Sequence, residues 1–210
     1  MQNNIGPVSG VKEIFQNLKK VFQDQPISIG DLRASLQEDL SSEPDFINLL
    51  EKHHDYLEES ISVLVDKDAS TQEKQAHLGR FLTVLNMHSK AEEETLYQSL
   101  KHASEKEVRL GAISSQDEHN LAQQLSQELK AMNFKKLWSE DIDAKAQVLA
   151  NLVHRHIAEE ETQMFSSAEE AVGSVKMIVL TNLYLEKCKT YLDEEMVADE
   201  MFASQQFHPQ

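Results

Sequence analysis

The chain has few of the residues that interrupt helices and few that attract polyanions. Its 210 residues include only 6 Gly and 4 Pro, whereas Leu, Ala, Glu, Gln and Lys are abundant, and this composition favours an all-helical protein. The excess of 36 Asp and Glu over 20 Lys and Arg gives a net charge of −16. We therefore expect neither nucleic acid nor an anionic membrane as a partner, because both are bound through clustered basic residues.

Cysteine and long apolar runs are also scarce. Cys188 is the only cysteine, so no intrachain disulfide can form, and a reducing, cytoplasmic location is expected. The first residues have neither a basic start nor an apolar run, which argues against a signal peptide. No stretch is long and apolar enough to span a bilayer.

What the sequence does contain is apolar residues at helical spacing, divided by turn and capping residues. The predicted helices cover residues 9–23, 31–40, 44–64, 71–103, 115–132, 141–170 and 175–202. The four long ones between residues 44 and 170 predict an all-α, antiparallel up-down-up-down four-helix bundle. We expect an N-terminal helical extension at 1–43, the bundle at 44–170, and a C-terminal helix at 171–210. That last helix would pack outside the bundle or form a homodimer.

One motif occurs twice inside these helices: His-x-x-x-Glu-Glu followed by two residues, an apolar residue and an aromatic residue. It reads HSKAEEETLY from His88 and HIAEEETQMF from His156. Residues four apart lie on one face of a helix, so each histidine points the same way as its glutamate, Glu92 or Glu160. Two further histidines complete a possible cluster: His54 on the inward stripe of its helix and His119 at the margin of another.

Two carboxylates in an apolar interior are costly unless a charge neutralises them. The inward stripes carry no basic residue near them, so we expect a pair of metal ions. Two imidazoles and two bridging carboxylate oxygens would bind each ion, and a position would stay open for a small ligand. The alternative is solvated glutamates with hydrogen-bonded core histidines. The bare motif does not decide this, because 24 Glu in the chain would give one or two such pairs by chance.

The segments LLEKHHDYLEE, HSKAEEETLY, DEHNLAQQL and HRHIAEEETQMF, in that order, resemble the hemerythrin family and its HHE cation-binding branch. The resemblance covers about residues 44–170 and implies a four-helix bundle with a non-haem di-iron centre. The implied metal ligands, with the two glutamates bridging, are His54, His88, Glu92, His119, His156 and Glu160. Imidazole and carboxylate suit iron, and they also suit manganese or zinc.

Three positions leave alternatives open. His53 and His54 are adjacent, and we expect only one to face inward; the apolar stripe favours His54 and leaves His53 at the surface or behind a ligand. Gln123 stands where oxygen-carrying hemerythrins have a further histidine, which argues against simple oxygen transport. Glu161 has the spacing of their last carboxylate, but the register of Glu160 matches that of Glu92.

Several neighbouring residues receive simpler interpretations. Tyr97 and Phe165 are expected to pack in the core, and Cys188 to be a small buried apolar residue. The remaining glutamates of the two motifs are expected to be solvated, although one of them could orient a ligand histidine. A ferritin-like centre would need two Glu-x-x-His motifs, and only Glu51 with His54 provides one.

The function expected from this pattern is a metal- and ligand-binding protein rather than a dedicated enzyme. Its di-iron centre would bind oxygen, nitric oxide or peroxide, for sensing or redox response. The alternatives are iron storage, iron–sulfur repair, or a di-iron peroxide or nitric oxide reductase. Repair is disfavoured because the family's repair proteins carry an N-terminal cysteine motif, which this chain lacks. No nucleophilic triad or phosphate-binding loop indicates another enzyme class.

Overall fold

A computed structural model describes residues 45–205, with side chains as far as residue 195. The expected N-terminal extension lies outside the described residues. The helices are α3 (Phe46–Val65), α4 (Thr71–Glu94), α5 (Leu96–Leu100), α6 (Lys106–Ala131), α7 (Glu140–Glu159), the π-helix η1 (Glu160–Met164), α8 (Phe165–Val172) and α9 (Ser174–Gln205). The described part of the chain contains no strand, so the predicted all-α class is confirmed.

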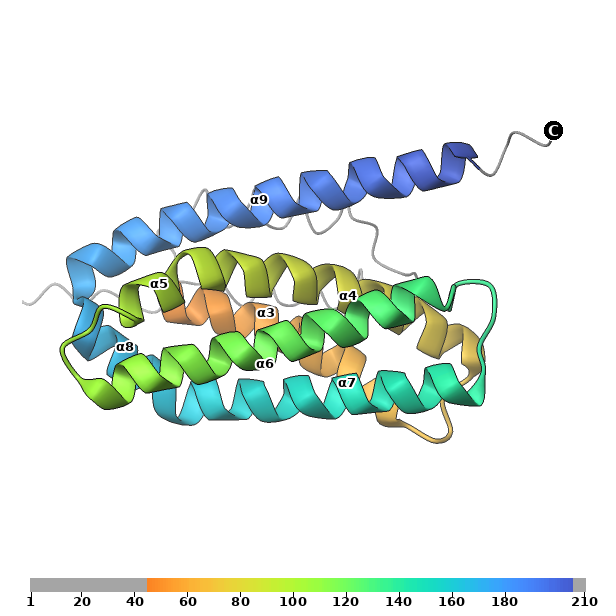
Figure 1. The fold of residues 1–210 in the computed structure, drawn as a ribbon, viewed down its shortest axis with the longest axis horizontal. Helices are drawn as coiled ribbons and strands as arrows, with labels where there is room; N and C mark the ends of the chain where they lie inside the picture. The colour runs from red at the N-terminus through yellow and green to blue at the C-terminus, as the bar shows by residue number, and fades with distance from the viewer. Residues whose placement is uncertain (1–44, 206–210) are drawn as a thin grey trace, which may run out of the picture.

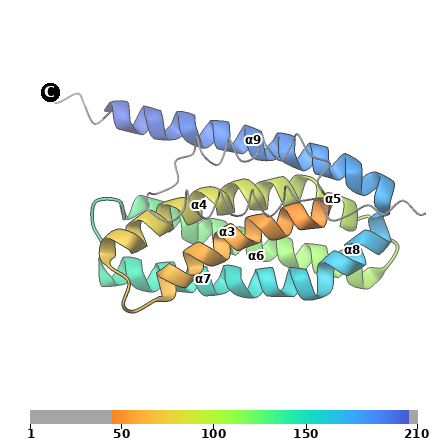
Figure 2. The same ribbon diagram turned by 180° about the vertical axis from the view of Figure 1, so that it is seen from behind.

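Four helices form the predicted antiparallel bundle. α3 packs against α4 and α7, and α6 packs against the same two helices. Successive helices run in opposite directions, as Figures 1 and 2 show from the two sides. None of the described helices is long and apolar enough to cross a membrane.

Side-chain caps fix where three bundle helices begin. The Asp45 carboxylate, just after Pro44, accepts the Ile47 N–H at 3.1 Å at the start of α3. At α4, Ser70 and Glu73 form a reciprocal capping box. Ser139 caps α7 by accepting an N–H bond, as the sequence indicates. These caps satisfy backbone N–H groups that have no partner inside the helix.

Two helices predicted to be continuous are in fact interrupted. α4 ends at Glu94, and Thr95 separates it from α5 with φ −121° and ψ −81°. The Thr95 hydroxyl donates to the Ala91 carbonyl at 2.6 Å, a bond that competes with the helix ladder. The predicted helix 141–170 contains η1, in which the Phe165 N–H bonds to the Glu160 carbonyl. By contrast, α6 runs unbroken through Gly111 and begins nine residues before the predicted start at 115.

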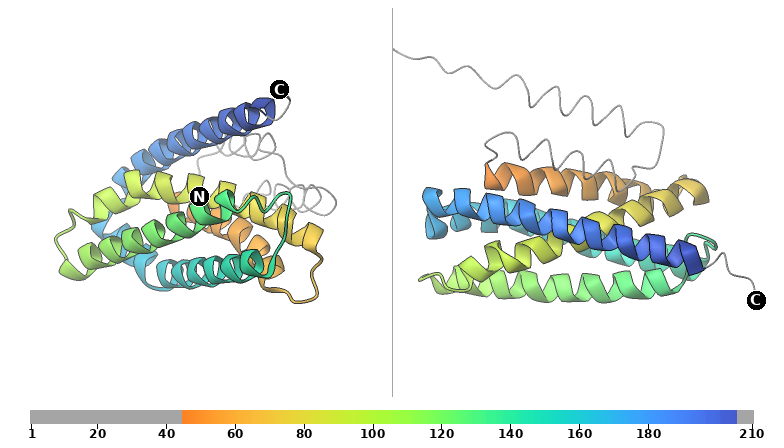
Figure 3. Two further views of the ribbon diagram at one scale, coloured as in Figure 1. Left: turned by 45° about the vertical axis from the view of Figure 1, so that its right-hand side comes forward. Right: turned by 90° about the horizontal axis from the view of Figure 1, so that it is seen from above.

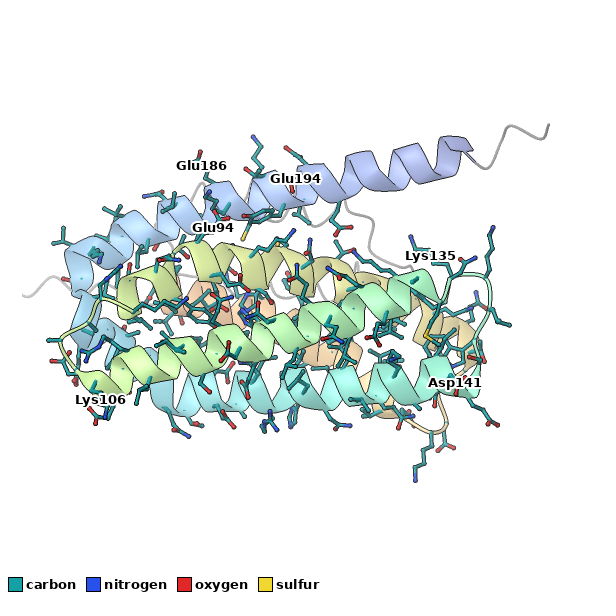
Figure 4. The ribbon with its side chains drawn as sticks, viewed as in Figure 1. Glu94, Lys106, Lys135, Asp141, Glu186 and Glu194 are labelled. Carbon is teal, nitrogen blue, oxygen red and sulfur yellow. The ribbon has the colours of Figure 1, made fainter. Side chains whose placement is uncertain are left out.

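The C-terminal helix α9 packs on the outside of the bundle. It contacts α4, α3 and α8, and Figure 3 shows it crossing over α4. Its inner face is buried and mainly apolar, with Leu180, Leu185 and Leu192 at 5% exposure or less. In Figure 4, Glu186 and Glu194 point away from the bundle, whereas Glu94 of α4 lies at the seam with α9. There it contacts Tyr191 and Lys187.

Two leucines that differ in burial provide a test of the assigned core. Leu149 of α7 is fully buried, whereas Leu121 of α6 is 54% exposed. We expect Leu149→Ala to lower the free energy of unfolding by about 2–5 kcal/mol, because it removes packed atoms and leaves a cavity. Leu121→Ala should change it by less than about 0.5 kcal/mol. Urea titration of both variants checks this, and equal losses would contradict the assigned core.

Candidate metal centre

The six residues selected from the sequence lie together inside the bundle. Each of the four bundle helices contributes one histidine, and the glutamates lie near the end of α4 and at the start of η1. All six side chains are at most 4% exposed. They form two overlapping groups whose nitrogen and oxygen atoms lie within 4.8 Å of one another: His54, His88, Glu92 and Glu160, and Glu92, His119 and His156.

The histidines form two pairs that face each other through their Nε2 atoms. In the first pair, His54 Nε2 lies 3.2 Å from His88 Nε2. In the second pair, His119 Nε2 lies 2.9 Å from His156 Nε2. Two facing ring nitrogens can share only one proton. The arrangement therefore directs lone pairs toward the centre of the bundle, as metal binding requires.

Glu92 lies between the two histidine pairs. Its Oε2 atom is 3.1 Å from His88 Nε2 and 3.8 Å from His119 Nε2. Its Oε1 atom is buried and accepts no hydrogen bond. A buried carboxylate oxygen without a partner is costly, so this atom fits a bound cation better than a closed hydrogen-bond network.

Glu160 also lies between the two histidine pairs, on the side opposite Glu92. Its Oε2 atom is 3.4 Å from both His54 Nε2 and His156 Nε2, and it too accepts no hydrogen bond. Each glutamate thus lies between one histidine of each pair. The donor set, four imidazoles and two carboxylates with unsatisfied buried oxygens, fits two cations that share both carboxylates.

The outer ring nitrogens of three of these histidines have acidic partners. Glu161 Oε1 hydrogen-bonds to His54 Nδ1 at 2.8 Å, and Glu118 Oε2 to His156 Nδ1 at 3.0 Å. Glu93 Oε1 lies 3.3 Å from His119 Nδ1 as an ion-pair contact, without a hydrogen bond. Such partners keep the proton on Nδ1 and leave Nε2 free to bind a metal. The sequence suggested this role for one glutamate of the motifs and did not single out Glu118 of α6.

The fourth histidine, His88, has a phenol as its outer partner. The Tyr184 hydroxyl of α9 lies 2.8 Å from His88 Nδ1 and 2.7 Å from His53 Nδ1. His53 is only 4% exposed. The expectation that only one of the adjacent histidines faces the interior is therefore wrong. His54 joins the cluster, and His53 is buried because α9 covers its side of α3.

Burial and mutual charge shift the pKa values of the cluster. Burial, followed by repulsion from Glu160, raises the pKa of Glu92. Burial also acts to raise the pKa of Glu160, but attraction to His156 and His54 outweighs it and lowers that pKa. For His54, the opposing effect of burial is outweighed by the nearby Glu160 carboxylate and by the hydrogen bond with Glu161, which raise its pKa to about 10. The cluster thus retains protons that a cation would replace.

Tyr97, which was expected to pack in the core, is also a member of the site. Its hydroxyl donates to Glu160 Oε1. The Tyr97 hydroxyl oxygen also lies 3.3 Å from His119 Nε2 and 3.4 Å from Glu92 Oε2. In the second copy of the motif the corresponding aromatic residue is Phe165, whose ring stacks on His54 with 5.7 Å between centroids. Both residues are buried in the core as expected, and Tyr97 adds polar contacts with the cluster.

A cavity lies beside this cluster. It has a volume of about 370 Å³, lies between α6 and η1, and has Glu160 on its wall together with Ser115, Gly111 and Met164. Glu160 and Ser115 are buried, at 1% and 7% exposure. One residue of the cluster therefore borders the cavity.

Substitution of Glu92, one of the two carboxylates that lie between the histidine pairs, tests whether the cluster binds metal. Gln has the shape of a protonated Glu, so metal-free Glu92→Gln should unfold at a urea concentration no lower than that of the unmodified protein. Fe(II) at 100 times its dissociation constant, added without oxygen, should stabilise the unmodified protein by about 2.7 kcal/mol for each ion bound. Glu92→Gln should lose most of this gain, and the exposed Glu170→Gln should keep it. A full gain in Glu92→Gln would exclude Glu92 as a ligand.

Comparison with known proteins places the chain in a family. The family model described as the hemerythrin HHE cation binding domain matches residues 45–168, more than half of the chain. The match includes all six residues of the cluster and ends before α9. No curated protein and no solved structure gives a significant match. The chain belongs to the hemerythrin HHE cation-binding family.

Proposed function

We propose that the protein binds two iron ions at this cluster and uses them to bind a small ligand such as oxygen, nitric oxide or peroxide. The observation that carries the proposal is the position of each glutamate between the two histidine pairs. The first pair would hold one ion and the second pair the other, with Glu92 and Glu160 as shared ligands. When bound, the iron pair would supply exchangeable, redox-active positions for the ligand.

Other residues of the chain would keep the site ordered and dry. Burial and nearby carboxylates raise the pKa of Tyr97 well above its usual value, so its hydroxyl stays protonated and holds Glu160 in place. The buried side chains of Leu57, Val84 and Val153 supply apolar surface around the ligand-bearing helices. An apolar surrounding limits water and favours small neutral ligands, and the cavity beside Glu160 would offer them space next to the cluster.

A sensing or redox-response role is favoured within this proposal. The cluster contacts α9 through Tyr184, so a change at the metal ions would reach a helix outside the bundle. The histidine and carboxylate donors also suit manganese and zinc, so metal analysis of the purified protein is the first test.

A matched pair of histidines on α7 tests the metal ligands. His156 is buried in the cluster, whereas the His154 side chain is 62% exposed. We expect two irons per chain in the unmodified protein and in His154→Gln, and fewer than two in His156→Gln, by elemental analysis after anaerobic loading. One zinc per chain and no iron would instead indicate a structural metal. Two irons in His156→Gln would exclude it as a required ligand.

The response of the loaded protein to ligands separates the possible roles. A sensor should bind nitric oxide or azide reversibly, with optical spectra that return on removal of the ligand. A reductase should consume peroxide or nitric oxide repeatedly when an electron donor is present. A storage protein should take up more than two irons per chain. We expect the first result, and either of the others would replace sensing as the function.

A further inference from the structure

α9 lies beyond the part of the chain that matches the family, yet one of its side chains reaches the metal centre. Tyr184 is fully buried, and its hydroxyl lies between His88 of α4 and His53 of α3, at 2.8 and 2.7 Å. α9 packs against both of these helices. Among the four histidines of the cluster, His88 alone has its outer nitrogen beside a group from α9.

Metal binding at His88 would fix the direction of its hydrogen bond with Tyr184. A histidine that binds a metal through Nε2 carries its proton on Nδ1. The His88 Nδ1–H must then donate to the Tyr184 oxygen. The Tyr184 hydroxyl proton remains available to His53 Nδ1 or to the Cys188 thiol. Metal binding through His88 Nε2 thus makes Tyr184 of α9 the acceptor for the proton of a ligand histidine.

Further polar contacts of α9 lie nearer the surface. Tyr191 and Lys187 contact Glu94, whose side chain is 44% exposed. Glu195 pairs with Lys130, whose side chain is 44% exposed, and accepts a hydrogen bond from the partly buried Asn86. Exposed ion pairs contribute little to docking. The apolar face of the helix therefore provides most of its docking surface, and the Tyr184 hydroxyl is its fully buried polar contact with the cluster.

We propose that Tyr184 is a positioning residue for the metal centre, and that metal binding through His88 holds α9 against the bundle. This inference rests on the proposed function. Coupling between two equilibria is reciprocal. If metal strengthens the docking of α9, a docked α9 strengthens metal binding by the same factor. The occupied and empty centres would then present different surfaces to a partner of the protein.

The chain supplies a matched control on the same helix. Tyr191 lies seven residues after Tyr184, is half-buried, and bonds to Glu94 rather than to the cluster. We expect Tyr184→Phe to weaken Fe(II) or Co(II) binding by about 10- to 100-fold, the usual effect of losing a partner that orients a ligand. It should also shift the visible spectrum of bound Co(II). Tyr191→Phe should match the unmodified protein in both measurements.

Hydrogen–deuterium exchange tests the coupling to α9 directly. In the unmodified protein and in Tyr191→Phe, Co(II) should slow amide exchange along α9. In Tyr184→Phe this slowing should be lost or strongly reduced. If Tyr184→Phe does not fold, Leu192→Ala serves instead, because Leu192 is buried on α9 but lies two turns beyond Tyr184. It should loosen α9 and thereby weaken metal binding, although it is not a member of the cluster.

The outcomes distinguish this inference from the function on which it rests. Unmodified protein that binds no metal would overturn both. Unmodified protein that binds two metal ions, with Tyr184→Phe equal to it in affinity, Co(II) spectrum and α9 exchange, would overturn the role of Tyr184 alone. Normal metal affinity in a folded Leu192→Ala with faster α9 exchange would overturn the coupling.

Discussion

The structure depends on two carboxylates placed where water cannot reach them. Glu92 and Glu160 are 0% and 1% exposed, and each leaves one oxygen without a hydrogen bond. Such groups are unfavourable in a protein interior unless a cation or a full set of donors balances them. The neighbouring histidines supply partial compensation, with a raised pKa at His54 and a lowered pKa at Glu160. A bound cation would supply the compensation that is still missing, and this sets the pocket apart from the rest of the core.

Regular helical hydrogen bonding is interrupted close to each of these glutamates. α4 ends two residues after Glu92, and α7 gives way to the π-helix at Glu160. An aromatic residue five positions later then packs on the cluster, Tyr97 in one case and Phe165 in the other. A continuous α-helix presents only one residue per turn to a given point. The interruptions accompany the close approach of a second residue from the same helix, and π-turns are frequent at functional sites for this reason.

Much of this arrangement could be predicted from the sequence, because it follows from periodicity. Apolar spacing located the bundle helices, with His54 on an inward face and His119 at the margin of one. The repeated motif placed the other two histidines and both glutamates of the cluster on inward faces. The burial of His53 was not predictable, since it depends on the docking of α9, a contact between residues 131 positions apart. Tyr97 packs in the core as predicted, but the contact of its hydroxyl with Glu160 was not predictable, because the spacing of apolar residues does not show what a buried hydroxyl contacts. The helix interruptions at Thr95 and Glu160 reflect local competition for backbone hydrogen bonds. Such competition cannot be inferred from the spacing of apolar residues.

The four histidines come from four different helices, and this would have a consequence for how the proposed metal ions are acquired. No fragment of the chain shorter than the whole bundle contains the complete proposed set of ligands, because His54 and Glu160 are separated by 106 residues. During synthesis the nascent chain would therefore hold metal only weakly until α7 has emerged and packed. Capture of the proposed ions would then follow closure of the bundle, and a chain that misfolds would not sequester them.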